Sequence, residues 1–307
     1  MRPASRAAVS ALVAVTALIA LGACASSGGG SPTSSGSTSG RIAVVASTNV
    51  WGDLARSVGG STVTVTSIIS DPNADPHSYE ASAQTELAIA KATLVIENGG
   101  GYDDFVATMV KASGTKARVL DAVTISGKQP VAGQLNEHVW YDFASVDKVV
   151  AAIAAALTAA DPAQADLFSA NASALTGQVA GLQQQLAAVR AAHAGAGVAI
   201  TEPVPVYLLD GAGLVDKTPA AFSAAIEAQN DVPPAVMQST LALLTRHDVA
   251  ALVYNEQAVG PQTSTVLDAA TRAGVPVVPV TETLPAGKTY VTWMASNIAA
   301  LGSALDK

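Results

Sequence analysis

The stretch DPAQADLFSANASALTGQVAGLQQQLAAVRAA, residues 161–192, decides the architecture that the sequence predicts. Asp161 followed by Pro162 is a favourable helix start, because Asp caps the free N–H groups and proline suits the first helical position. Apolar residues then recur at steps of three or four residues, or multiples of them, at Leu167, Phe168, Leu175, Val179, Leu182, Leu186 and Val189. A continuous helix over this stretch is ~45 Å long at about 1.5 Å per residue. We expect it to join two lobes as a stiff strut.

Before this helix, short apolar runs alternate with helical patterns. The predicted strands are residues 42–46, 63–69, 93–96 and 118–120, and the predicted helices lie near residues 49–58, 82–91 and 103–112. One more helix is predicted to begin at Ser145, as its N-cap, and to continue through Leu157. Alternating strands and helices are typical of a mostly parallel sheet covered by helices.

A second alternating set follows the long helix. Strands are predicted at residues 198–200, 251–254 and 275–280, and helices near residues 218–228, 236–247, 262–273 and 288–304. Pro276 and Pro279 weaken the last strand or place it at the edge of its sheet. The sequence therefore predicts an α/β protein of two lobes, at residues 41–160 and 194–307, with a linking helix at residues 161–193.

The N-terminus has the pattern of an export signal. Residues 1–23 combine Arg2 and Arg6 with an apolar run that is too short to span a bilayer. The following Leu21-Gly22-Ala23-Cys24 matches the bacterial lipobox, which implies cleavage before Cys24 and anchoring of its thiol to membrane lipid. The alternative is an ordinary signal peptide followed by a stray cysteine. Residues 24–40 are rich in Ser and Gly and are expected to form a flexible tether.

The charge of the chain restricts its partners. It holds 16 basic and 24 acidic residues, for a net charge of −8. Removal of residues 1–23 takes away two arginines and no acid, which moves the net charge to −10. Such an acidic body argues against binding of nucleic acid, which needs clustered Lys and Arg. Cys24 is the single cysteine, so no disulfide can form within one chain.

Two of the four histidines lie in loop-like segments that suit a metal site. His77 lies in Asp75-Pro76-His77-Ser78-Tyr79-Glu80, and His138 lies in Asn136-Glu137-His138-Val139-Trp140. Glu202 and Glu282 each follow a predicted strand, and ligands of α/β sheets gather at the carboxyl ends of strands. Two imidazoles and two carboxylates can hold a divalent transition metal. Taken singly, each of these residues also fits a solvated or hydrogen-bonding role.

Three further residues are weaker candidates for the same site. Glu256 follows the strand at residues 251–254 and is either a substitute for Glu282 as ligand or a residue that supports the ligands. His193 and His247 lie at predicted helix ends, where an imidazole interacts with free carbonyl groups and with the helix dipole. We interpret both of these histidines as structural.

The two histidine segments, in this order and after a lipobox, resemble the bacterial zinc/manganese ABC-transporter solute-binding lipoproteins, the TroA-like or ZnuA-like family. The resemblance covers about residues 41–305 and implies a class III-type periplasmic-binding-protein architecture with the metal buried between the lobes. It places His77 and His138 at the two N-lobe histidine positions. Glu202 falls where zinc-type members often have His and manganese-type members often have Glu, and Glu282 falls where the family usually has Asp.

The resemblance implies capture of Zn²⁺ or Mn²⁺ outside the cytoplasm and its delivery to an ABC permease, by a lipoprotein anchored to the cell membrane and expected to be a monomer. Two carboxylates favour manganese more than an all-imidazole set does, whereas intrinsic affinity favours zinc. Iron is a third possible cargo.

Two other functions stay open from the sequence. One is an adhesin or scaffold on the same fold. The other is a metal-dependent hydrolase, which would need an open coordination position and a general base. The sequence contains no His-Glu-x-x-His motif, and we expect a binding protein and not an enzyme.

Overall fold

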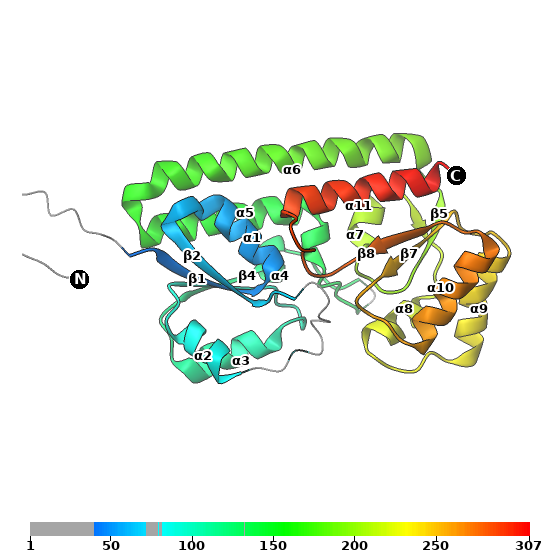
Figure 1. The fold of residues 1–307 in the computed structure, drawn as a ribbon, viewed down its shortest axis with the longest axis horizontal. Helices are drawn as coiled ribbons and strands as arrows, with labels where there is room; N and C mark the ends of the chain where they lie inside the picture. Colours follow the sequence, from blue (N-terminus) through cyan, green and yellow to red (C-terminus); the bar gives the residue numbers. More distant parts are fainter. Residues whose placement is uncertain (1–39, 72–78, 80–81, 132) are drawn as a thin grey trace, which may run out of the picture. The chain divides into compact units, whose positions relative to one another are not determined.

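Four parallel strands form the sheet of the N-terminal lobe (Figure 1). They are β1 (Ile42–Thr48), β2 (Val63–Ile69), β3 (Leu94–Glu97) and β4 (Arg118–Asp121), in the order β2-β1-β3-β4. β1 is almost entirely buried, because it is a central strand and its apolar side chains are covered on both faces of the sheet. The computed structural model describes residues 40–71, 79, 82–131 and 133–307. The predicted signal peptide, Cys24, nearly all of the tether and His77 lie outside these residues.

Helices cover both faces of this first sheet. Val44 and Ala46 of β1 pack with α1 (Asn49–Gly59) and α5 (Phe143–Ala160). Val45 faces the other way, into a smaller cluster with α2 (Ala83–Ala90) and α3 (Asp104–Ser113). The short α4 (Ala122–Ser126) follows β4 and was not predicted. Alternate β1 side chains thus serve the two hydrophobic clusters, as the two-residue period of a strand requires.

The C-terminal lobe repeats this topology. Its strands are β5 (Gly197–Ile200), β6 (Val215–Asp216), β7 (Ala251–Asn255) and β8 (Val277–Val280), in the order β6-β5-β7-β8, and all are parallel. In both sheets the second strand is an edge strand that pairs with the first, and the third strand pairs with the other side of the first. Pro279 lies in β8 at the edge of the sheet, as predicted, because an edge strand tolerates the missing N–H group.

Five helices belong to this second half. They are α7 (Val206–Gly211), α8 (Ala220–Glu227), α9 (Pro234–Thr245), α10 (Pro261–Ala273) and α11 (Tyr290–Leu305). One face of the sheet packs with α8, α9 and α10 in a cluster that includes Phe222, Leu244 and Val266. The sequence predicted four of these helices and missed α7 and the two-residue strand β6, both too short to show a period.

The predicted linking helix is α6 (Ala165–His193), which extends for 29 residues and contacts α1, α5 and α11 (Figure 1). It follows a 3₁₀ turn (Pro162–Gln164) that Asp161 caps by accepting a hydrogen bond of 3.2 Å from the Ala163 N–H. The largest hydrophobic cluster includes Leu175 and Leu182 of this helix and side chains of both sheets. This confirms two parallel α/β lobes with a long helix between them.

The start of α5 differs from the prediction. The N-cap is Asp142 and not Ser145, because the Asp142 carboxylate accepts hydrogen bonds from both the N–H and the hydroxyl of Ser145. Among the described residues, α5 is the one helix long and apolar enough to cross a membrane by length and composition. Here it is a core helix, with Val149, Val150 and Ile153 fully buried against the rest of the protein.

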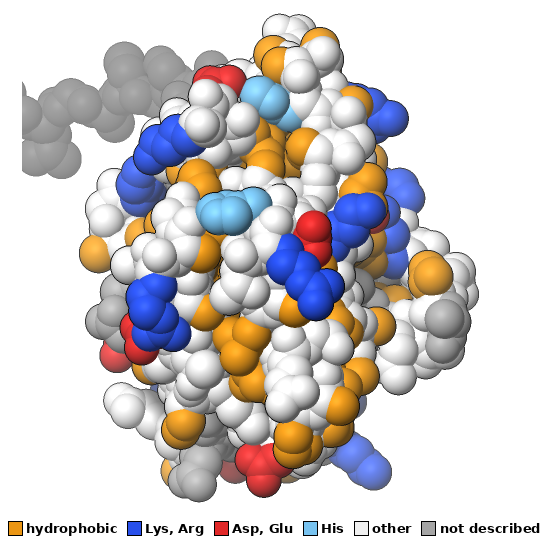
Figure 2. Space-filling model, turned by 90° about the vertical axis from the view of Figure 1, so that its right-hand side faces the viewer, with side chains coloured by type: hydrophobic (Ala, Val, Ile, Leu, Met, Phe, Trp, Pro, Cys, Tyr) orange, Lys and Arg blue, Asp and Glu red, His pale blue; other side chains and the backbone are white. Residues whose placement is uncertain are grey.

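The surface mixes side chains of different kinds. On the face shown in Figure 2, Lys and Arg side chains are spread among acidic, hydrophobic, histidine and uncharged ones.

The second residue after the end of α9 is held in a left-handed conformation. His247 has a φ of 55°, its N–H donates to the Leu244 carbonyl, and the Asp248 N–H donates to the Leu243 carbonyl. These two bonds make a Schellman motif, in which the left-handed position favours glycine. His247 is exposed, and its backbone closes the end of the helix.

We expect His247→Gly to be more stable than His247→Ala by ~1 kcal/mol, because only glycine adopts this conformation without a steric cost. Both variants remove the imidazole, so their difference isolates the backbone. Denaturant unfolding measures it, and equal midpoints would contradict the proposed origin of the strain.

Candidate metal centre

One half of the candidate metal centre lies at the carboxyl ends of β5 and β7. These two strands are neighbours at the point where the strand order of the C-terminal sheet reverses, which is where α/β sheets bind ligands. Glu202 follows β5, and Asn255 is the last residue of β7. The Asn255 amide donates one hydrogen bond to Glu202 Oε2 and another, of 2.8 Å, to Glu282 Oε1. A single buried amide therefore holds two carboxylates side by side.

The loop that carries Glu282 is fixed through its backbone. Gln257 Oε1 accepts hydrogen bonds from the N–H groups of Glu282 and Thr283, and Gln257 Nε2 donates to Thr283 Oγ1 at 2.6 Å. Asn49, at the start of α1, exchanges two hydrogen bonds of 2.8 and 2.9 Å with the backbone of Leu284. Residues of both lobes thus fix the position of the Glu282 carboxylate.

His138 brings an imidazole from the N-terminal lobe. Its Nδ1 lies 2.8 Å from Asn136 Oδ1, and Asn136 Nδ2 donates to the Pro203 carbonyl at 3.0 Å. Because the Asn136 amide nitrogen is engaged there, its oxygen faces the ring and accepts from Nδ1–H, which leaves the lone pair of the neutral imidazole on Nε2. This nitrogen lies 3.8 Å from Glu227 Oε1 and 3.8 Å from Glu282 Oε2.

Aromatic rings surround this imidazole. The ring centroids of Trp140 and Tyr102 lie 5.1 and 5.9 Å from that of His138, both edge-on. The two rings are themselves 5.0 Å apart. Asn98, just after β3, donates at 3.0 Å to the Glu137 carbonyl and so ties the histidine segment to the end of the first sheet. His138 is fully buried as a result.

Two carboxylates that the sequence analysis did not select complete the cluster. Ligand atoms of Glu137, His138 and Glu227 all lie within 4.8 Å of one another. Glu227 is the last residue of α8, and Gln229, two residues later, is left-handed with a φ of 53°. Hydrogen bonds from Gln229 to Ile226 and from Asn230 to Ala225 close this helix end and direct the Glu227 side chain to the centre.

Burial dominates the electrostatics of these groups. It raises the pKa of Glu202 to about 8, against the hydrogen bond from Asn255 and with the help of Glu282 and Glu227. Burial likewise raises the pKa of Glu137, although His138 beside it acts in the opposite direction. For His138, burial lowers the pKa, but the carboxylates of Glu227, Glu282 and Glu137 outweigh it, so that the pKa is raised overall.

The structure brings together three of the four predicted ligands, His138, Glu202 and Glu282, all buried. Glu256 lies on the exposed side of the chain, and it is its neighbour Asn255 that reaches the centre. His77 lies outside the described residues. His193 ends α6 and pairs with Asp306 at 3.1 Å, near the C-terminus.

The sequence gives only weak indications of the three site residues that it did not predict, Glu137, Glu227 and Asn255. Glu137 adjoins His138 in the segment that was singled out. Glu227 is the only charged residue in α8. Asn255 is a polar residue at the end of an otherwise apolar buried strand. None of these features shows by itself where the side chain points.

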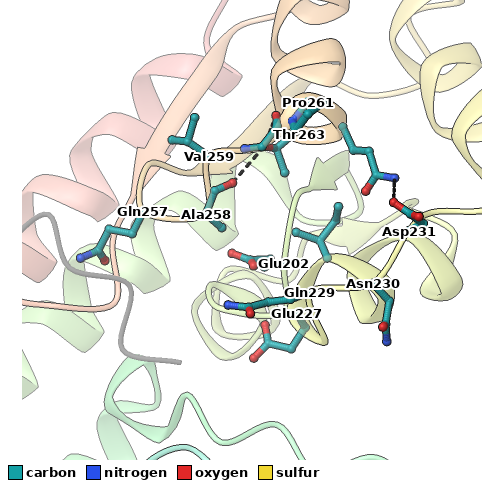
Figure 3. A pocket seen from close by; sticks show the side chains of 13 residues that line it. Glu202, Glu227, Gln229, Asn230, Asp231, Gln257, Ala258, Val259, Pro261 and Thr263 are labelled. Carbon is teal, nitrogen blue, oxygen red and sulfur yellow. Dashed lines mark hydrogen bonds between the residues drawn. The ribbon is translucent and has the colours of Figure 1, made fainter. Parts of the chain in front are cut away.

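A cavity of about 340 Å³ adjoins the centre on the side of the C-terminal lobe. Glu202 and Glu227 lie in its wall, and the rest of it comes from the segments after α8 and after β7 (Figure 3).

Comparison with known families extends these findings. The family model of the zinc-uptake complex component A, periplasmic (ZnuA), matches residues 44–304. The metal ABC transporter substrate-binding lipoprotein FimA of Streptococcus parasanguinis is 26% identical over 167 residues, which are 50% of this chain and 53% of that protein. The manganese ABC transporter substrate-binding lipoprotein PsaA of Streptococcus pneumoniae is 26% identical over 165 residues, with 50% and 53% covered. The chain spans about half the length of the curated relatives it matches.

Solved structures show the same fold. The periplasmic zinc-binding protein TroA of Treponema pallidum has a TM-score of 0.70 at 19% identity, covering 87% of this chain and 99% of that one. The solute-binding protein FpvC of Pseudomonas aeruginosa, in complex with Mn²⁺, has a TM-score of 0.71 at 20% identity, covering 87% and 98%. A laminin-binding adhesin (Lmb) of Streptococcus agalactiae, solved as a mutant, has a TM-score of 0.72 at 20% identity, covering 86% and 99%.

The family model spans nearly the whole described chain, and the two lobes with their linking helix have the fold of these structures. The chain therefore belongs to the family of the periplasmic zinc-uptake component A, whose members are solute-binding proteins of metal ABC transporters and not enzymes.

Proposed function

We propose that this protein captures a divalent transition metal, Zn²⁺ or Mn²⁺, as cargo between its lobes and delivers it to an ABC permease. The observation that carries the proposal is the pair of 3.8 Å separations between His138 Nε2 and the carboxylate oxygens of Glu227 and Glu282. Two donors that each lie about 2.1 Å from one ion can be at most ~4.2 Å apart. Both separations are longer than a hydrogen bond and short enough for donors that share an ion.

The charge of the centre also supports a cation as ligand. Glu137, Glu202, Glu227 and Glu282 surround one imidazole in a largely buried space, with no Lys or Arg among the described groups that shift their pKa values. Buried carboxylates that remain ionised cost free energy unless a cation compensates them. A bound dication offsets two of the negative charges and relieves their mutual repulsion.

The donor chemistry bears on which metal is carried. His77 is proposed from the sequence as the second imidazole, beside His138, with Glu202 and Glu282 as the carboxylate ligands and Glu227 as an additional carboxylate. Oxygen ligands favour Mn²⁺ more than an imidazole-rich set does, although intrinsic affinity follows the order that places Zn²⁺ above Mn²⁺. We infer that Glu227 moves the selectivity of this site toward Mn²⁺.

Export and anchoring complete the proposal. Residues 1–23 are proposed as a signal peptide, Cys24 as the lipidated residue and residues 24–40 as the tether that leaves the lobes free outside the membrane. The lobes are assigned to residues 41–160 and 194–307. The relatives FimA and PsaA are lipoproteins, which supports this assignment.

The alternative function is that of an adhesin on the same fold, and the structural similarity to Lmb is the reason to consider it. Adhesion requires an exposed surface. The feature that most distinguishes this chain is a buried cluster of carboxylates around His138, which a surface interaction does not need. Metal capture therefore explains more of the structure.

Substitutions should distinguish the residues that bind the metal from those that do not. We expect Glu282→Gln, Glu227→Gln and His77→Ala to weaken binding of Zn²⁺ and Mn²⁺ at least tenfold, because each removes a donor or a negative charge. Glu256→Gln is the matched control, and it should bind as the wild type does, because Glu256 is exposed. Calorimetric titration of chelator-treated protein measures the affinities.

A thermal melt compares the same variants through the increase in stability that bound metal gives. Metal at a hundred times its dissociation constant should raise the free energy of unfolding by ~2.7 kcal/mol. Loss of affinity in Glu256→Gln with full affinity in Glu282→Gln would reverse the assignment of these two carboxylates. A wild-type melt that responds to none of Zn²⁺, Mn²⁺ and Fe²⁺ would exclude metal capture.

The pKa of Glu202 predicts a pH dependence of the metal-free protein. Its pKa is about 8 when folded, above the ordinary value of 4.5, so the folded state holds the proton more tightly. Its contribution to stability is complete below about pH 4.5 and is lost as the pH rises through about 8. We expect the slope to be at most ~1.4 kcal/mol per pH unit for this one group.

Glu202→Gln is the control for this experiment, because glutamine cannot titrate and keeps the shape of the side chain. The free energy of unfolding should fall less between pH 5 and pH 8 in Glu202→Gln than in the wild type. Identical pH profiles of the two metal-free proteins would show that Glu202 ionises normally. Saturating metal should also remove the difference, because the metal displaces the proton.

A further inference from the structure

The ligand side chains are too deeply buried for a metal to reach them directly from solvent. His138 is 0% exposed, Glu282 is 2% exposed and Glu202 is 4% exposed. An ion must therefore enter either by separation of the lobes or along a path through one of them.

Separation of the lobes is opposed by hydrogen bonds close to the centre. The Tyr141 hydroxyl donates to the Thr281 carbonyl at 2.8 Å, next to Glu282. The Asn136 amide donates to the Pro203 carbonyl at 3.0 Å, next to Glu202, and Tyr207 donates back to the Asn136 carbonyl at 2.8 Å. Because these bonds flank the ligands, an opening wide enough for an ion would break them and expose apolar residues of the shared core.

The cavity beside the centre offers a path that leaves these bonds in place. Its volume is about 340 Å³, and all of the described residues that line it belong to the C-terminal lobe. Glu202 and Glu227 form its inner wall, and Glu227 lies 3.8 Å from His138 Nε2. Val259 and Asp231 also line it, and both are exposed, Val259 at 70% (Figure 3). The cavity thus leads from solvent to the side chains of Glu202 and Glu227, and the carboxylate oxygens of Glu227 are buried behind its wall.

The lining suits a hydrated cation. Besides Glu202 and Glu227 it includes the Asp231 carboxylate and side-chain amides, and none of its described residues is Lys or Arg. These amides belong to Gln229, Asn230 and Gln262, whereas the amide of Gln257, which also lines the cavity, is engaged with the loop that carries Glu282. Six waters at about 30 Å³ each occupy ~180 Å³, which is less than the volume of the cavity. Carboxylate and amide oxygens can replace these waters one at a time as the ion moves inward.

We propose that this cavity is the entrance by which the metal reaches the centre, with Asp231 as the outer attracting charge and Glu227 as the residue that passes the ion to His138. The inference rests on the proposed function. Apart from Glu227, which also belongs to the centre, it assigns to the segments 226–231 and 257–263 a role that is separate from holding the bound ion.

Blocking the entrance tests the proposal through kinetics. Val259→Trp places an indole at an exposed position of the cavity and touches no ligand. Leu167→Trp, on α6, is the matched control because it is also exposed, at 37%, and lies away from the cavity. Stopped-flow exchange of Zn²⁺ and Mn²⁺ between the protein and a fluorescent metal indicator gives both rate constants.

We expect Val259→Trp to slow association and dissociation at least fivefold by the same factor, with the dissociation constant unchanged. A barrier on the path affects both directions equally, whereas a change at the binding site alters the ratio. Unchanged rates in Val259→Trp would overturn the proposal and favour entry between the lobes. A weaker affinity with unchanged association would also overturn it, by making the cavity part of the binding site.

Removal of a charge tests the entrance in a second way. Asp231→Asn should lower the association rate two- to threefold at low ionic strength and reduce its dependence on salt, because cation attraction is electrostatic. Asp268→Asn removes the same charge from an exposed position on α10, 69% exposed, and should leave the rate unchanged. Equal effects of both variants would show general attraction by net charge and overturn the role of Asp231. A wild type that binds no metal would instead refute the proposed function itself.

Discussion

Burial of like charges is the constraint on which this structure depends. Four glutamates converge on one imidazole in a space that is largely closed to water, and such an arrangement resists folding unless other groups compensate it. Part of the compensation is the Asn255 amide, whose two hydrogens serve Glu202 and Glu282. We propose that protonation supplies the remainder in the metal-free protein and that a bound cation would supply it in the loaded protein. On this proposal, part of the free energy of metal binding would come from relief of the repulsion between the buried carboxylates.

The repeated strand order explains how the centre is positioned. In each sheet the first and third strands are neighbours, so the loops after them diverge and leave space at the carboxyl edge. In the C-terminal lobe these loops present Glu202 and Asn255. In the N-terminal lobe Asn98, after β3, holds the segment that carries His138. Similar edges of two similar sheets therefore contribute different halves of one site.

Much of this could be predicted from the sequence, for reasons that are local. The central strands are short apolar runs, and α6 shows its helical period over many turns, so both were predicted with nearly correct bounds. Glu202 and Glu282 were selected because polar residues after buried strands gather at one edge, and His138 because it is a histidine in a loop-like segment. Glu227 was not, because its place in the centre depends on where α8 ends and on how Gln229 closes it. Asp142 was passed over as the cap of α5 because Ser145, three residues later, has an equally suitable side chain.

The largest hydrophobic cluster has a consequence for the cooperativity of the molecule. It contains Val44 and Ile96 of the first sheet, Val198 and Val253 of the second, and the buried side of α6 between them. Neither lobe can lose its packing without exposing apolar surface of the other. We therefore expect the two lobes to unfold together as one thermodynamic unit, despite their separate sheets. Stabilisation by a ligand at the centre is accordingly transmitted to the whole folded chain.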